Sequence, residues 1–340
     1  MQTDFRLIKR NRFYYIGYIN PNGKRRWKTT KQSTQNEALK VLKQFQSPTE
    51  KNEQHILLSD MLKEYLDNRG KLLRTRTLKD YILYLNEFIA IVGNKPLQQY
   101  SQTDVEKFRN TLRERGLKNT TINIRHRSIK AIFGYAVQYD YIPVSPFRHI
   151  KLISIPQRTP TFMTKEQFAE FSVNVDDRRM LDLYLVALLT GARLAEITNL
   201  RWDCVDFENQ QIVIRNTDSF TTKSGKQRTI PMHKEVVEIL QRIKSNQSNS
   251  LYVFCKESGY KFSNSFVSHE FKRYCRLANL PNELHFHSLR HTFASWCVQS
   301  DVDIYVVKEL LGHSTIKTTE IYSHISKSKL HHSVNQLQLN

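Results

Sequence analysis

The chain has 340 residues and a formal net charge of +20, and 39% of its residues are hydrophobic. This length and apolar content predict two or three domains with packed cores, and the excess of lysine and arginine is typical of proteins that bind a polyanion, most often nucleic acid. The four cysteines form no C-x-x-C pair and match no zinc-ligand spacing, and no segment has the composition of a signal peptide or a membrane span, so we expect a cytoplasmic protein with reduced thiols, no metal and no membrane partner.

Residues 1–48 predict a small, basic α+β module. Residues 13–19 are aromatic and β-branched, as in a strand, and residues 24–30 follow a turn as a second strand, so a sheet of two or three strands is expected. Thr34 and Glu37 have the spacing of a capping box that opens a helix. A basic sheet of this size can bind in a DNA groove, although a passive basic domain would have the same composition. The predicted DNA contacts of this module are Arg25, Arg26 and Lys28.

Residues 56–148 predict a helical domain, because apolar residues recur at helical spacing in four segments. The expected helices span residues 57–66, 78–91, 103–115 and 120–139. Polar and basic residues on the last helix lie beside the backbone donors of its N-terminus, which favours contact with phosphate groups; a solvated helix face is the alternative. The predicted DNA contacts of this domain are Lys118, Asn123, Arg125, Arg127 and Lys130.

Residues 160–330 predict a third domain of mixed α+β structure, which follows a proline-containing linker. A second capping box begins at Thr164, and the apolar helix 181–189 is expected to end at Gly191. Two charged residues, Arg193 and Glu196, come directly after this glycine.

The middle of this domain predicts β structure. Residues 211–215 have strand composition, and residues 220–223 and 227–232 are expected to pair as a hairpin. Lys223 and Lys226 flank the predicted turn, so either lysine could bring a positive charge to a site beside the hairpin.

The C-terminal stretch contains residue types that suit phosphodiester chemistry. His287 and Arg290 are three residues apart, so on a helix both side chains lie on one face. His313 directly follows a glycine that ends an apolar helix pattern. Tyr322 is expected on a short helix of residues 315–323.

Arginine and tyrosine together indicate a particular reaction. Arginine forks match phosphate oxygens and keep their charge, and tyrosine can act as a nucleophile that forms a covalent intermediate. Attack on a DNA phosphate would form a phosphotyrosine bond and release one strand end. Because such a transesterification conserves the bond energy, it requires neither ATP nor a hydrolytic metal, and no cofactor is predicted.

One ordered set of residues resembles the catalytic motifs of the tyrosine site-specific recombinases, or phage integrases. It consists of Arg193, Lys223, His287, Arg290, His313 and Tyr322. The resemblance implies that the tyrosine is the nucleophile, that the two arginines bind the scissile phosphate, that the first histidine is an acid/base partner and that the second donates to the phosphate. It also implies that Lys223 protonates the departing 5′-oxygen and that Glu196 orients a catalytic side chain.

The resemblance extends to the domain organisation. Residues 1–48 resemble the arm-site-binding modules of phage integrases, and residues 56–148 resemble the helical core-binding domain of the family. The implied fold is multidomain and mainly α, with a mixed α+β catalytic domain at residues 160–330 and a tail at residues 331–340.

A site-specific DNA recombinase is the function that this resemblance implies. Such an enzyme cuts and rejoins double-stranded DNA through a 3′-phosphotyrosine, integrates and excises a mobile element, and acts as a homotetramer on DNA, with accessory DNA-bending or excision factors as further partners. A type IB topoisomerase would share the chemistry but rejoin the same strand, and a non-catalytic DNA-binding protein would share the charge; both alternatives stay open. A metal-dependent nuclease is disfavoured, because no carboxylate cluster accompanies the motifs.

Overall fold

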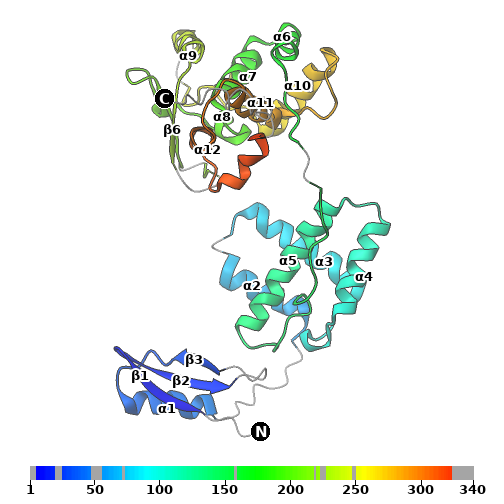
Figure 1. The fold of residues 1–340 in the computed structure, drawn as a ribbon, viewed down its shortest axis with the longest axis vertical. Helices are drawn as coiled ribbons and strands as arrows, with labels where there is room; N and C mark the ends of the chain where they lie inside the picture. The colour runs from blue at the N-terminus through cyan, green and yellow to red at the C-terminus, as the bar shows by residue number, and fades with distance from the viewer. Residues whose placement is uncertain are drawn as a thin grey trace, which may run out of the picture. The chain divides into compact units, whose positions relative to one another are not determined.

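The computed structural model divides into two compact units, Met1–Pro156 and Gln157–Asn340 (Figure 1). The structure describes residues 5–19, 25–46, 56–70, 73–156, 159–217, 220–222, 227–246 and 250–323. The described chain is mainly helical and contains two three-stranded sheets, which confirms the predicted fold class. None of the helices in these ranges combines the length and the hydropathy that a membrane span requires.

The N-terminal module is a three-stranded antiparallel sheet with one helix against it (Figure 1). The strands are β1 (Arg6–Arg10), β2 (Phe13–Ile19) and β3 (Arg25–Thr29), and the helix is α1 (Gln35–Gln46). Ile16 in the central strand and Ala38 in α1 are buried and form the small core. The Thr34 hydroxyl donates to a Glu37 carboxylate oxygen at 2.8 Å, so the predicted capping pair begins α1.

Four helices form the remainder of the first unit. They are α2 (Leu58–Arg69), α3 (Thr75–Val92), α4 (Gln102–Glu114) and α5 (Asn119–Gln138), with the 3-10 helix η2 (Leu97–Gln99) between α3 and α4. All four predicted helices are present, with ends shifted by a few residues. The core is aromatic: Phe88, Phe108, Phe133 and Phe147 are fully buried and in ring contact.

The second unit is built around a buried helix. Its α-helices are α6 (Lys165–Val173), α7 (Arg178–Thr190), α8 (Leu194–Thr198), α9 (Lys234–Asn246), α10 (Asn264–Leu277), α11 (Phe286–Gln299) and α12 (Ile304–Leu311). The described part of this unit also contains the 3-10 helices η3 (Trp202–Cys204) and η4 (Ile316–Thr318) and the strands β4 (Val205–Asp206), β5 (Gln211–Ile214) and β6 (Arg228–Pro231). Apolar residues on most sides of α7 are buried, and α11 packs directly against it. The Thr164 hydroxyl accepts from the Gln167 backbone N–H, so the predicted capping box is confirmed.

The predicted hairpin of the second unit was wrong. Strand β6 pairs with β5, with Ile214 opposite Arg228, and residues 220–222 are not the partner strand of a hairpin. The short helix expected over residues 315–323 is present as short 3-10 segments, and Tyr322 lies in the second of them. Both segments are too short for periodicity to separate one conformation from another.

Candidate active site

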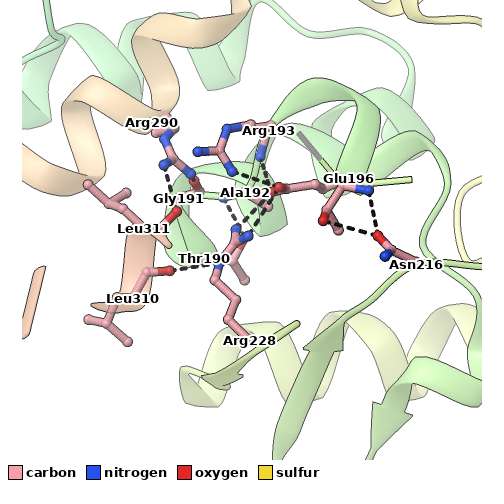
Figure 2. Close-up of polar contacts among 11 residues, drawn as sticks. Thr190, Gly191, Ala192, Arg193, Glu196, Asn216, Arg228, Arg290, Leu310 and Leu311 are labelled. Atoms are coloured by element: carbon pink, nitrogen blue, oxygen red, sulfur yellow. Dashed lines mark hydrogen bonds and ion pairs between the residues drawn. The ribbon is translucent and has the colours of Figure 1, made fainter. Parts of the chain in front are cut away.

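The candidate site is built from four separate segments of the second unit, and it includes residues that the sequence analysis did not single out. Arg193 and Glu196 lie where α7 ends and α8 begins, Arg290 lies on α11, and Arg228 opens β6 (Figure 2). The end of α12 reaches the same place, since its carbonyl groups accept hydrogen bonds from two of these arginines (Figure 2). The lysine expected from the sequence, Lys223, lies outside the described residues, as does the alternative, Lys226.

The Arg290 side chain is held by two backbone carbonyl groups. One terminal nitrogen, Nη1, donates to the Gly191 oxygen at 2.7 Å, and the other, Nη2, donates to the Leu311 oxygen at 2.6 Å (Figure 2). Only 2% of the residue is exposed. Burial, with the charge of Arg193, lowers its pKa, yet a guanidinium stays protonated at neutral pH. The cation is therefore fixed between the ends of α7 and α12.

Glu196 is a buried carboxylate that two arginines share. The Arg193 guanidinium donates to it at 2.8 Å, and the Arg193 backbone N–H donates at the same distance. Arg228 binds both carboxylate oxygens in a fork, at 3.1 and 2.7 Å (Figure 2). Burial alone would raise the pKa of this carboxyl, but the hydrogen bonds and charge of Arg228, with those of Arg193, lower it to about 2.

Arg228 had no role in the sequence analysis. Besides Glu196, it contacts the end of α12, where its Nε donates to the Leu310 oxygen at 3.1 Å. An arginine at the start of a strand is usually a surface residue, so only the fold reveals that this one links β6, α8 and α12. Around one carboxylate the site therefore contains three arginines, and the surplus of positive charge suits a phosphate.

Two glycines allow the ends of helices α7 and α12 to pack closely against neighbouring side chains. Gly191, at the end of α7, and Gly312, at the end of α12, both have left-handed backbone conformations, with φ of 61° and 64°. A Cβ atom on Gly191 would lie 2.5 Å from Phe293, and one on Gly312 would lie 2.7 Å from Arg228. Both positions therefore require glycine for space as well as for conformation.

Tyr322 is enclosed by the protein and hydrogen-bonded to a histidine. Only 1% of the residue is exposed, and its hydroxyl lies 2.6 Å from Nδ1 of His291. Burial raises the pKa of Tyr322 to about 12, and burial with nearby cationic groups lowers the pKa of His291 to about 4. His291 was missed in the sequence analysis, although its position one helical turn after His287 places both rings on one face of α11.

The other two histidines differ in their surroundings. Nδ1 of His313 lies 2.9 Å from the hydroxyl of the buried Thr319. Burial and the charges of Arg290 and Arg193 lower the pKa of His313 to about 3, so its ring is neutral near pH 7. His287 is exposed at the surface of α11, and its ring meets that of His291 edge to face, with centroids 4.9 Å apart.

The three basic residues predicted to contact DNA from β3 do not share one face of the sheet. Lys28 is opposite the buried Ile16 and Arg26 is opposite Tyr18, so both belong to the face that α1 covers. Arg25 lies on the opposite, open face. Trp27 lies there too, and its ring is 4.4 Å from the Arg10 guanidinium.

The basic residues predicted on α5 also separate. Lys118, Arg127 and Lys130 are exposed, whereas Arg125 is half-buried and paired with Glu87. The prediction that Asn123 contacts DNA does not fit its position. It is 2% exposed, and its side-chain amide is bonded to the Ile153 backbone N–H and carbonyl groups at 3.0 and 2.8 Å.

Within the described ranges, no three or more His, Cys, Asp or Glu side chains gather in a group that could hold a metal ion. The site described above combines three arginines, the Glu196 carboxylate, imidazoles and one phenol.

Comparison with known proteins identifies the class. The model of the phage integrase family matches residues 161–329, and the model of the phage integrase N-terminal SAM-like domain matches residues 58–142. Together they cover most of the chain, which belongs to the phage integrase family of tyrosine recombinases.

Relatives and solved structures agree with this assignment. The tyrosine recombinase XerA of Pyrococcus horikoshii is 28% identical over 298 residues, which span 85% of this chain and 97% of that protein. The Tn1549 transposon integrase, solved in complex with transposon right end DNA, has a TM-score of 0.71 at 24% identity and covers 83% of this chain and 99% of its own. A lambda integrase tetramer bound to a Holliday junction has a TM-score of 0.65 at 16% identity, covering 91% and 95%. At these identities the two structures establish the fold alone.

Proposed function

We propose that this protein, as a tyrosine recombinase, cuts and rejoins double-stranded DNA at specific sites through a 3′-phosphotyrosine bond to Tyr322. The observation that supports the proposal best is the clustering of Arg193, Arg290 and His313, which gives the site an excess of positive charge. Tyr322 lies in the adjoining turn, close enough to feel the charge of Arg290. The family supports the reaction class, and the contacts of the described residues support their proposed roles.

Each side chain has a role in this proposal. Arg193 and Arg290 bind the non-bridging oxygens of the scissile phosphate and stabilise the charge that develops on them, as fixed donors do. Thr319 engages Nδ1 of His313, which leaves Nε2 as the ring nitrogen that can donate to the phosphate. His287 lies beside these groups as an acid/base partner, and Lys223 protonates the departing 5′-oxygen.

The proposed substrate is an attachment site of a mobile element, which the protein integrates and excises as a tetramer on bacterial DNA. The resemblance in fold to the Tn1549 transposon integrase and to lambda integrase supports this proposal. On the N-terminal sheet, the open face with Arg25, Trp27 and Arg10 is the surface that we propose contacts a second, arm-type DNA site.

A nicked suicide substrate tests the nucleophile. Candidate attachment-site DNA, taken from the sequence that flanks the gene, is incubated with wild-type protein and with Tyr322→Phe, and covalent adducts are resolved on a denaturing gel. We expect an adduct with the wild type and none with the variant, because phenylalanine has no oxygen to attack phosphorus.

The outcomes separate the alternatives. An adduct that persists in Tyr322→Phe contradicts the assignment of the nucleophile. Adduct formation without strand transfer to a second duplex, combined with relaxation of supercoiled plasmids that lack the site, would indicate a topoisomerase. Tight binding of DNA without any adduct would favour a non-catalytic DNA-binding protein.

A further inference from the structure

We propose that His291 is a catalytic residue, the base that takes the phenolic proton of Tyr322 during strand cleavage and returns it during ligation. The inference rests on the proposed function, because it assigns a partner to the nucleophile of that reaction. It gives the transfer of the phenolic proton to a residue that the catalytic motif does not include, so the acid/base role of His287 does not extend to this proton.

The geometry of the contact identifies the proton acceptor. The Tyr322 hydroxyl lies 2.6 Å from Nδ1 of His291, a distance at which a base can abstract a proton. A phenol donates here, so Nδ1 accepts and the ring proton is on Nε2. Among the residues that the structure describes, Tyr322 makes no hydrogen bond to His287, whose imidazole is instead exposed one turn earlier on α11.

The surroundings keep this imidazole in the form that a base requires. Burial, with the charges of His285 and Arg290, disfavours its protonated form, and the His287 ring packs against it edge to face. The ring is consequently neutral across the physiological range and can accept a proton. Tyr322 needs such an acceptor, because burial also disfavours its phenolate, whereas Arg290 favours it.

Each proton in the proposed cleavage step has a donor and an acceptor. The Tyr322 O–H bond breaks as its proton passes to Nδ1 of His291, and the phenolate oxygen forms a bond to phosphorus. The bond from phosphorus to the 5′-oxygen breaks, and this oxygen takes a proton from Lys223. In ligation the 5′-hydroxyl gives its proton to Lys223 and forms a bond to phosphorus, the bond from phosphorus to the Tyr322 oxygen breaks, and His291 returns its proton to the phenolate. No oxidant, reductant or co-reactant is required.

Two substitutions separate the base from the hydrogen bond. His291→Asn keeps an oxygen that can accept from the phenol but cannot take its proton, and His291→Ala removes both. We expect each variant to bind the attachment site as the wild type does and to cleave the suicide substrate about 10²- to 10³-fold more slowly, the range of a general base. His269→Ala, which removes an exposed histidine of α10, is the matched control and should cleave normally.

Chemical rescue gives a readout that a merely structural role would not produce. Added imidazole should accelerate cleavage by His291→Ala and leave the wild type unchanged. Replacement of Tyr322 by 3,5-difluorotyrosine, whose phenol is more acidic, should also recover part of the lost rate in His291→Ala, because ionisation of the phenol limits that variant.

Some results would overturn the role of His291 and leave the proposed function intact. If Tyr322→Phe forms no adduct but His291→Asn and His291→Ala cleave at the wild-type rate or faster, Tyr322 remains the nucleophile and His291 is not its base. Slow cleavage by a correctly folded His291→Ala that neither imidazole nor fluorination restores would overturn it as well. An adduct that survives in Tyr322→Phe would instead overturn the proposed function.

Discussion

At the scale of single residues, the distribution of charge around Glu196 explains how Arg193 can serve a phosphate. If Arg193 were the sole partner of this buried carboxylate, the pair would be neutral and would attract an anion weakly. Arg228 binds both oxygens of Glu196 and lies on the side toward α12. Arg228 therefore neutralises the negative charge of Glu196, and the positive charge of Arg193 remains available to a phosphate.

Replacement of Arg228 tests this balance. We expect Arg228→Met to lower the free energy of unfolding of the second unit by about 3–5 kcal/mol, since a buried charge loses its partner. Urea unfolding of the full chain measures this change. Arg179→Met, which removes exposed ion pairs with Asp177 and Glu257, is the control and should cost less than about 1 kcal/mol. Equal stability of the two variants would contradict the account.

The same pair gives a pH dependence with a defined sign. The pKa of Glu196 falls from 4.5 to about 2 on folding, so the unfolded chain binds more protons between these values. The stability that this carboxylate supplies is complete above pH 4.5 and is lost as the pH falls toward 2. Arg228→Met removes the main interaction that lowers this pKa, so the loss of unfolding free energy between pH 4.5 and 2 should be smaller in the variant than in the wild type.

The motif residues could be read from the sequence, but their partners could not. Arg193, His287, Arg290, His313 and Tyr322 were predicted, because local sequence surrounds each with a recognisable pattern. The roles of Arg228 and His291 depend on contacts with Glu196 and Tyr322, which lie 31 or more residues away in the chain. Asn123 shows the opposite case: a polar residue at a helical position was predicted to face DNA, and it binds the backbone of Ile153.

At the scale of elements, the ends of two helices determine the site. Helix α7 ends at Gly191 and α12 ends at Gly312, and both ends were predicted correctly from glycine after an apolar run. The pairing of β6 with β5 was not predicted. The two strands are joined by a long connection, and short strands lack a pattern that selects one partner over another.

Substitution of Gly191 tests how tightly these ends are packed. We expect Gly191→Ala to destabilise the second unit by about 2–4 kcal/mol, from the left-handed backbone and from overlap with Phe293. Gly259→Ala is the matched control in the same unit, because Gly259 has φ of 79° and nothing within 4 Å of a new Cβ. It should cost about 1–2 kcal/mol, the conformational part alone. Thermal unfolding of both variants decides whether packing contributes.

At the scale of the whole molecule, the net charge of +20 makes DNA binding a salt-dependent reaction. A basic surface attracts any duplex, so affinity for DNA by itself does not identify the attachment site. Sequence composition predicted this general attraction, but it could not assign charges to faces. In β3, adjacent basic residues alternate between the open face of the sheet and the face that α1 covers.

The faces of the N-terminal sheet lead to a prediction for arm-type DNA. We expect Arg25→Gln to reduce the slope of log affinity against log salt by about 0.9, the value for one lost phosphate contact. Arg26→Gln, on the opposite face, should leave the slope unchanged. Titration of labelled duplex at several salt concentrations measures both, and a larger effect of Arg26→Gln would place the DNA on the other side. Neither change should alter cleavage of a core-type suicide substrate.

The end of α12 has a consequence for timing. Its last two carbonyl groups, those of Leu310 and Leu311, are bound by Arg228 and Arg290 respectively. The chain that leaves this helix end continues to Tyr322. Movement of that segment would disturb both hydrogen bonds, and hence the orientation of the two guanidinium groups. We therefore expect displacement of Tyr322 from its turn to loosen both hydrogen bonds, and with them the binding of the scissile phosphate by the arginines.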